Sequence, residues 1–92
     1  MLMMRRIVGQ SMEPTLKHGQ TIVAVRRLRP TAGTLVIIRH GNKEKIKRVH
    51  RVKHGLIYVV GDNPPASTDS RHFGWLPASS VVAVVVWPLK AT

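Results

Sequence analysis

Short runs of β-branched and other apolar residues, separated by glycine and proline, recur through most of the chain. They lie at residues 21–25, 34–38, 43–52, 56–60 and 81–87, with a shorter run at residues 5–8. The periodicity is two rather than 3.6, and no stretch has the apolar spacing of an amphipathic helix. Residues 77–80 are long enough for one helical turn at most. The pattern predicts an all-β fold.

Two of these runs, residues 34–38 and 43–52, are predicted to form a hairpin, because Gly41 and Asn42 between them favour a tight turn. Short strands of this kind pack as a small, mostly antiparallel barrel or sandwich. With 92 residues, the chain is expected to form a single domain over residues 1–92. Residues 61–75 are its longest irregular stretch, and a loop of that length in so small a domain usually carries function.

The chain is strongly basic, with a formal net charge of +11 from 15 lysines and arginines against 4 acidic residues. Such a charge favours nucleic acid or an anionic membrane surface as a partner. Proteins that read single-stranded nucleic acid stack its bases on aromatic side chains, and only 4% of the residues in this chain are aromatic. We therefore expect no nucleic acid partner, and a peripheral contact with an anionic membrane stays open.

Neither a disulfide nor a transmembrane segment is expected. The chain has no cysteine, which excludes a thiolate metal site and a cysteine nucleophile and fits a reducing compartment. Its longest apolar run, residues 81–87, is far shorter than the ~20 residues that cross a bilayer as a helix. Arg5 and Arg6 follow the first four residues too closely for a signal-peptide core. We expect a cytoplasmic location, at most peripheral to the membrane.

Ser11 is a candidate nucleophile. It lies in the segment GQSMEPTL, residues 9–16, where Pro14 restricts the backbone just after the serine. The hydroxyl is thus expected on a short loop that follows a strand. A serine hydroxyl is a weak nucleophile at neutral pH and needs a base to take its proton. The simpler alternative is a turn serine that caps a local backbone amide.

Lys47, in the segment IKRV at residues 46–49, is the candidate base. A lysine acts as a base only when its amine is neutral, so burial or nearby cations must lower its pKa. We expect Lys47 on the same side of its strand as Val49, with Lys45 and Arg48 adding positive charge nearby. Both effects act in the required direction. The alternative is a solvated lysine on a basic strand.

The five histidines are the rival bases: His18, His40, His50, His54 and His72. None has an aspartate at a helpful spacing, and no His-x-x-x-His pair or carboxylate cluster indicates a metal site. His72 is the one to consider, because it lies in the long loop. We expect the histidines to be surface residues, and we expect no metal ion or other cofactor.

The long loop holds polar residues that are suited to brace a site. Asp69 and Arg71 have opposite charges and lie close in sequence, so they can pin the loop, with Asp62 as a second acceptor for the guanidinium. Ser67 is placed to hydrogen-bond the amine of Lys47 and orient it. The alternative is a polar surface loop whose local ion pairs contribute ~0–1 kcal/mol each.

In this order, the three segments resemble the type I signal peptidase family of serine–lysine proteases. Residues 11–15, Ser-Met-Glu-Pro-Thr, are similar to the nucleophile box of that family, and residues 46–49 are similar to its catalytic-lysine box. Residues 61–74 are similar to its Gly-Asp-Asn…Ser-x-Asp-Ser-Arg…Gly box. The likeness extends from residue 8 to residue 86.

This resemblance implies a serine endopeptidase in which Ser11 is the nucleophile and Lys47 is the general base. It implies that Ser67 orients the lysine, that the backbone amide of Ser11 holds the oxyanion, and that Met12 lies by the substrate groove. The residues that would brace the site are Asp62, Asp69 and Arg71. An acyl ester would form on Ser11 and be released by water that Lys47 activates, without a cofactor.

The resemblance also implies a precursor polypeptide as the substrate. It would lie extended, as an added strand beside the segment before Ser11 or beside Lys47, with a small residue just before the cut. Members that process secreted precursors usually carry an N-terminal membrane anchor, and we expect none here. Gly9 stands where some members place a serine hydroxyl near the oxyanion, which removes a donor worth ~2–4 kcal/mol.

Within the family, the segment PASTDSRHFG at residues 65–74 is most similar to the maturation proteases that remove a propeptide from nickel superoxide dismutase. The alternative is a signal peptidase that docks on the membrane through basic residues. Self-cleaving repressors share the serine–lysine chemistry but are not expected, because only ten residues precede Ser11. The non-enzymatic alternative is a basic β module whose binding to nucleic acid would weaken steeply with salt.

Overall fold

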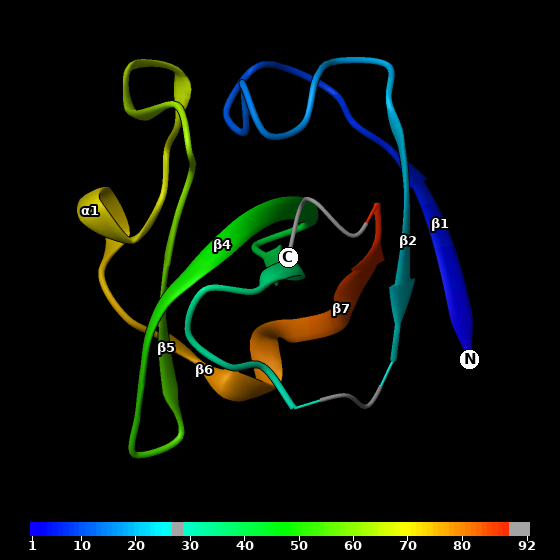
Figure 1. Cartoon of the computed structure of the whole chain (residues 1–92). Helices are drawn as coiled ribbons and strands as arrows, with labels where there is room; N and C mark the ends of the chain where they lie inside the picture. The colour runs from blue at the N-terminus through cyan, green and yellow to red at the C-terminus, as the bar shows by residue number, and fades with distance from the viewer. Residues whose placement is uncertain (27–28, 89–92) are drawn as a thin grey trace.

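The protein, as described by a computed structural model over residues 1–26 and 29–88, contains one antiparallel sheet (Figure 1). Its strands are β1 (Leu2–Arg6), β2 (Thr21–Val25), β3 (Leu35–His40), β4 (Lys43–Lys53), β5 (Leu56–Val60), β6 (Leu76–Pro77) and β7 (Val81–Trp87). Their order across the sheet is β1-β2-β7-β3-β4-β5-β6. The all-β prediction is confirmed. The sheet is open rather than a closed barrel, because β1 and β6 are its two edges.

Most of the strands lie where the sequence pattern predicts them. The hairpin between β3 and β4 is confirmed, with His40 opposite Lys43 and Gly41 at a φ of 63° in the turn. The first strand begins at Leu2 rather than at residue 5, and it ends at Arg6 rather than at residue 8. The chain turns soon after, at Gly9, where φ is 88°. The sequence did not indicate β6, which has two residues and is too short for a period to show.

Two apolar clusters form the core, and strand β3 contributes to both of them. Leu35 and Ile37 belong to the first cluster, and Val36 and Ile38 belong to the second. All four side chains are fully buried. Ala83 and Val85 of β7 belong to the first cluster, and Val84 between them belongs to the second. Because both faces of these central strands are covered, their sequences are continuous apolar runs rather than alternating ones.

Strand β4 changes partner half-way along its length. Residues 43–48 pair with β3, and residues 48–53 pair with β5. The predicted alternation holds as far as Val49, which is fully buried in the second cluster, and then a register shift before Arg51 interrupts it. Among the described residues, β4 has no partner other than β3 over residues 43–47, so that stretch has a free backbone edge. This edge matters for the site.

The long loop is more ordered than its sequence suggests. It contains a 3₁₀ turn at Pro64–Ala66 and a one-turn helix, α1 (Ser70–Phe73). Asp69 caps α1, accepting a hydrogen bond from the amide of Arg71. The short turn predicted near residues 77–80 is a 3₁₀ turn at Ala78–Ser80. Within the described ranges, no helix has the length and apolar character needed to cross a membrane.

Candidate active site

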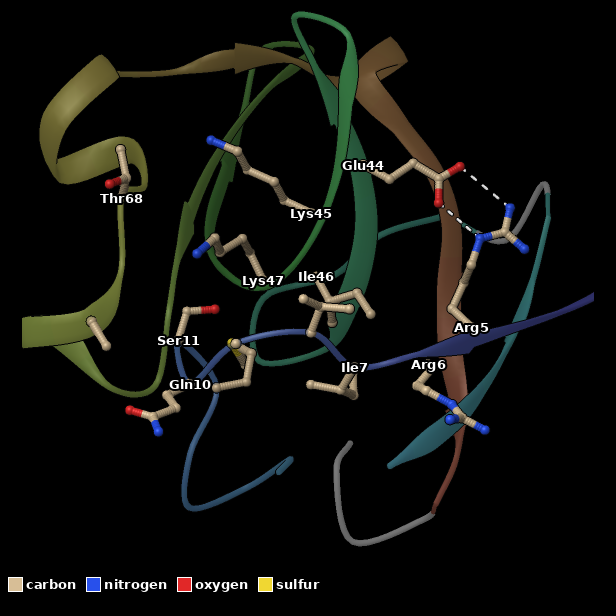
Figure 2. A pocket seen from close by; sticks show the side chains of 14 residues that line it. Arg5, Arg6, Ile7, Gln10, Ser11, Glu44, Lys45, Ile46, Lys47 and Thr68 are labelled. Atoms are coloured by element: carbon tan, nitrogen blue, oxygen red, sulfur yellow. Dashed lines mark hydrogen bonds and ion pairs between the residues drawn. The ribbon is translucent and has the colours of Figure 1, made fainter. Parts of the chain in front are cut away.

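Ser11 lies in the turn that follows β1, and its neighbours hold that turn against the core. Met12 and Leu16 are buried in the first apolar cluster, and the amide of Leu16 donates to the carbonyl of Met12 at 2.9 Å. Ser11 itself is half-buried. Its side chain projects into a cleft that Lys47 also lines (Figure 2). The apolar residues on either side of the turn thus set the position of the hydroxyl.

The backbone of Ser11 is tied to the long loop by Asn63. The amide of Asn63 donates to the carbonyl of Ser11 at 2.9 Å, and its side chain donates to the carbonyl of Gln10 at 3.0 Å. The amide of Ser11 donates to no residue in the ranges 1–26 and 29–88. Asn63 was not predicted to hold Ser11. The signals at this position were the turn after a strand and the Gly-Asp-Asn of the family-like box, residues 61–63.

Lys47 lies on β4 and is almost completely buried, with 3% of its surface exposed. Its Nζ donates to Ser67 Oγ at 2.8 Å, which is the contact expected from the sequence. Burial lowers the pKa of Lys47; Asp69 opposes this shift, and the positive charges of Lys45 and then Arg71 reinforce it. The expected help from Arg48 is absent from these causes, since that guanidinium is paired with a carboxylate elsewhere.

Asp69 is the centre of a buried network behind Lys47. It is fully buried and accepts hydrogen bonds from Ser67 Oγ at 2.6 Å and from the amide of Gly61 at 2.8 Å. The guanidinium of Arg71 donates to both of its oxygens, at 3.0 and 2.6 Å. Burial alone would raise the pKa of Asp69, but these donors hold it well below its ordinary value. The carboxylate therefore stays charged.

This network determines which way the hydrogen bonds run at Lys47. A serine hydroxyl has a single proton, and Ser67 gives that proton to Asp69. Ser67 must therefore accept from Lys47. One N–H of the amine is used in this bond, so the lone pair of a neutral Lys47 amine points elsewhere. Ser67 and Asp69 together orient the amine without consuming its basic electron pair.

The expected ion pair between Asp62 and Arg71 is wrong. Arg71 folds back onto Asp69, the cap of the same short helix, and onto the carbonyl of Gly61 at 3.1 Å. Asp62 instead accepts from Arg48 Nε at 2.9 Å and Nη2 at 2.8 Å, and from the hydroxyl of Thr15. Arg48 lies opposite the end of β5 in the sheet, which brings it close to Asp62.

Gly61 is the point where the nucleophile turn meets the long loop. A Cβ placed on it would lie 2.6 Å from the Cβ of Ser67 and 2.7 Å from the carbonyl oxygen of Ser11, and it would also overlap Ser67 Oγ. Its φ is not positive, so backbone conformation does not require glycine here. The requirement is steric, because the backbone of Gly61 contacts both segments directly.

The cleft has a volume of about 400 Å³ and lies between two rims. Residues 5–12 form one rim and residues 44–47 the other, with Ala66 and Thr68 from the long loop. Ser11, Met12 and Lys47 line it. The residues predicted to brace the site are not among the described residues that line it: Ser67, Asp62, Asp69 and Arg71. No histidine is among the described residues that line it, and the side chain of His72 is 59% exposed.

Comparison with known proteins agrees with this geometry. Residues 1–75 match the Peptidase S24-like family. The chain belongs to this family. It is also similar to signal peptidase I of Bacillus caldolyticus, with 42% identity over 50 residues. That match covers 51% of this chain and 28% of the relative, so the chain corresponds to much less than two thirds of that protein.

In this S24-like chain, the site combines two groups that acyl-transfer chemistry uses. One is a half-buried hydroxyl on a turn held by Met12 and Asn63. The other is a buried amine with a lowered pKa, oriented by Ser67. For activation, a base must come within hydrogen-bond reach of the hydroxyl. Among the described residues, Ser67 is the hydrogen-bond partner of Lys47 Nζ, and no hydrogen bond joins Nζ to Ser11 Oγ. Asp62 and Asp69 are not among the described residues that line the cleft.

Proposed function

We propose that this protein is a serine endopeptidase in which Ser11 is the nucleophile and Lys47 is the general base. The observation that carries the proposal is the amine of Lys47, which is buried, held by Ser67 and open to the same cleft as Ser11. Because burial lowers its pKa, the amine is neutral at a lower pH than a free lysine would be. A neutral amine can take the serine proton.

The reaction would proceed in two acyl transfers. As Ser11 Oγ attacks the substrate carbonyl carbon, its proton passes to Lys47 Nζ. When the tetrahedral intermediate collapses, the peptide C–N bond breaks and the Lys47 ammonium returns the proton to the leaving amine. Water then attacks the acyl ester while Lys47 Nζ takes one of its protons. The bond between the acyl carbon and Ser11 Oγ breaks, the acid product leaves, and the Lys47 ammonium returns its proton to Ser11 Oγ.

The amide of Ser11 is our candidate for binding the oxyanion. Within the described part of the chain it has no acceptor, so its N–H is available to a ligand. Donors of this kind are effective because they are already oriented when charge develops in the transition state. Removing one donor typically costs ~3 kcal/mol of transition-state stabilisation.

The two rims of the cleft fit a substrate that binds as an extended strand. The amide and carbonyl of Ile7 are bonded to the carbonyl of Gln20 and the amide of Gly19, on the β2 side. In an extended chain the next residue directs its backbone groups to the opposite side, so those of Val8 face the cleft. The free edge at residues 43–47 faces it from β4. A peptide between the rims can pair with both.

Alanine variants of the two central residues test this proposal. Ser11→Ala and Lys47→Ala are each expected to lower kcat by at least ~10³-fold, since a serine without its base is a weak nucleophile. Lys45→Ala is the matched control, because Lys45 lines the same cleft two residues away and should keep cleavage at high pH. Cleavage that persists in a pure Lys47→Ala preparation, with circular dichroism matching the parent, would refute Lys47 as the general base.

For the substrate, we propose the N-terminal leader of a precursor protein, cut after a small residue. The segment at residues 65–74 supports the precursor of nickel superoxide dismutase in particular. Incubating the protein with that precursor and sequencing the new N-terminus tests this choice directly. A mature N-terminus that appears only with active Ser11 supports it. An intact precursor, alongside cleavage of other leaders, would exclude it.

The second candidate substrate is an exported precursor at a membrane surface. One relative is a signal peptidase I. The outer face of β1 and β7 also exposes apolar side chains, with Leu2 at 69%, Met4 at 66% and Trp87 at 53%, beside the basic Arg6. Met4 and Trp87 flank Val23 from the two sides of β2, about two strand spacings, ~10 Å, apart. Co-sedimentation with anionic but not neutral lipid vesicles, lost in Met4→Ser, would support this candidate.

A further inference from the structure

A bidentate ion pair joins the two rims of the cleft at the end away from Ser11 and Lys47 (Figure 2). Arg5 Nε donates to Glu44 Oε1 at 2.8 Å, and Arg5 Nη2 donates to Oε2 at 3.3 Å. Arg5 lies on β1 and Glu44 on β4, which three other strands separate in the sheet. No backbone ladder joins β1 to β4. The side-chain pair therefore connects two strands that the open sheet leaves apart.

Both side chains lie on the inner faces of their strands. Met3 is buried in the first apolar cluster, and Arg5 is two residues further along β1 on the same face. Ile46 packs against that cluster, and Glu44 is two residues before it on β4. The pair thus lies over the margin of the core. Ile46 and Ile7 line the cleft between it and the proposed catalytic residues.

Charge also distinguishes this pair from the rest of the cleft. Glu44 is the only carboxylate among the described residues that line it, whereas Arg6 and Lys45 also line it. The hydrogen bond from Arg5 lowers the pKa of Glu44, so the carboxylate stays charged near neutrality. Ion pairs this exposed add little to stability. The main effect of the pair is therefore on the geometry of the two rims.

We propose that the Arg5–Glu44 pair is a strap that sets the width of the remote end of the peptide groove and so positions one flank of the substrate. The proposal rests on the peptidase function proposed above. Six positions separate Arg5 from Ser11, which is about 20 Å of extended chain at ~3.3 Å per residue. A strand that pairs with both rims needs them about two strand spacings apart, ~10 Å. In the sheet, β1 forms backbone hydrogen bonds only with β2, so the strap limits the movement of this edge strand.

Peptides of different length test the strap. The probe is an internally quenched peptide of about twelve extended residues, ~40 Å, with alanine on both sides of its central bond. Two truncated forms each keep a short flank on one side. In the parent, the longer peptide is expected to have the higher kcat/KM. Arg5→Gln and Glu44→Gln should each lower the ratio of long to truncated kcat/KM about tenfold for one of the two truncated forms, the one that lacks the flank at the strap, through KM of the long peptide.

Arg39→Gln is the matched control. Arg39 lies 3.5 Å from Glu44 but does not line the cleft, so its loss should leave the ratio unchanged. The double variant Arg5→Gln/Glu44→Gln should lose no more than either single variant, since both remove one interaction. Equal losses for the long peptide and both truncated forms, or additive losses in the double variant, would overturn the strap.

The strap and the peptidase proposal can fail separately. In a Ser11→Ala background, the dissociation constant of the long peptide reports on the groove without any cleavage. Arg5→Gln in that background should weaken binding about tenfold, close to 1.4 kcal/mol. Unchanged binding would refute the strap even if the parent cleaves peptides. A parent that binds the long peptide through the strap but cleaves nothing would instead refute the peptidase proposal.

Discussion

Two aspartates in the same loop hold different halves of the site, and they differ mainly in burial. The side chain of Asp69 is fully buried, whereas that of Asp62 is 16% exposed. Each accepts a pair of hydrogen bonds from an arginine guanidinium. Asp69 is linked through Ser67 to the amine of Lys47. Asp62 is linked through Thr15 to the turn that carries Ser11.

With Lys47 as the proposed base and Ser11 as the proposed nucleophile, one network positions each of them. Asp69 is fully buried, so its hydrogen bonds from Ser67 and Gly61 are costly to lose, although the side chain of Arg71 is 37% exposed. The Asp62 network joins the nucleophile turn to Arg48, which also donates to the carbonyl of Gly33 at 2.6 Å. Water can replace part of that network. Substitutions in the two networks should therefore differ in size and in which step they impair.

The largest effect is expected from Asp69→Asn. Removing this charge leaves Arg71, Gly61 and Ser67 with one buried amide oxygen in place of a carboxylate, and we expect a loss of about 3 kcal/mol in the free energy of unfolding. Guanidinium titration at neutral pH measures it. Ser67 would no longer be fixed as an acceptor for the amine of Lys47, so cleavage should fall by more than the loss of stability explains. A stability equal to the parent would remove Asp69 from its bracing role.

The dependence of stability on acid pH is a second test of Asp69. The pKa of Asp69 is lower in the folded protein than its ordinary value of 3.8. A depressed carboxyl pKa gives stability that is complete above the ordinary value and is lost as pH falls below it. Asp69→Asn should therefore flatten the acid limb of the stability profile. If the variant loses stability at acid pH as steeply as the parent, that loss comes from groups other than Asp69.

Gly61→Ala should have the next largest effect, about 2 kcal/mol, because the new methyl group overlaps Ser67 and approaches the carbonyl of Ser11. Gly55→Ala is the matched control. Gly55 has a φ of 77° and open space around its Cβ position, so only backbone strain of ~1 kcal/mol is expected there. Thermal unfolding compares the two. If Gly55→Ala destabilises more, the steric account of Gly61 is wrong.

A smaller effect is expected from Asp62→Asn. The side chains of Asp62 and Arg48 are partly exposed, at 16% and 27%, so the loss in unfolding free energy should be about 1 kcal/mol. The pH profile of cleavage should stay where it is, because neither residue is among the causes of the lowered pKa of Lys47. A displaced profile would mean that the two networks are not separate.

The smallest expected change is a displacement of the pH profile by Lys45→Gln. The positive charge of Lys45 lowers the pKa of Lys47, so its removal raises that pKa. Activity requires the neutral amine, and the rising limb of kcat/KM should therefore move to higher pH. Arg39→Gln, on the neighbouring strand, serves as a control for loss of a surface charge. A limb that moves to lower pH would contradict Lys47 as the base.

Much of the fold could be predicted from local pattern. Runs such as residues 56–60 and 81–87 coincide with β5 and β7, because a strand shows in its own residues which faces are buried. The same holds for the Gly41 turn. The one-turn helix at Ser70–Phe73 was missed, since four residues carry no period. The open sheet was not predicted either, because closure depends on how distant strands meet.

For the site, the sequence alone determined that a serine, a lysine and a polar loop stand in family-like order, and that the protein is built from antiparallel strands. Only the tertiary structure decided that Arg48, rather than Arg71, pairs with Asp62, and that Arg5 reaches Glu44. Charged partners are chosen by distance in space, and a bent sheet brings together residues that are far apart along the chain. Local patterns record burial but not those distances.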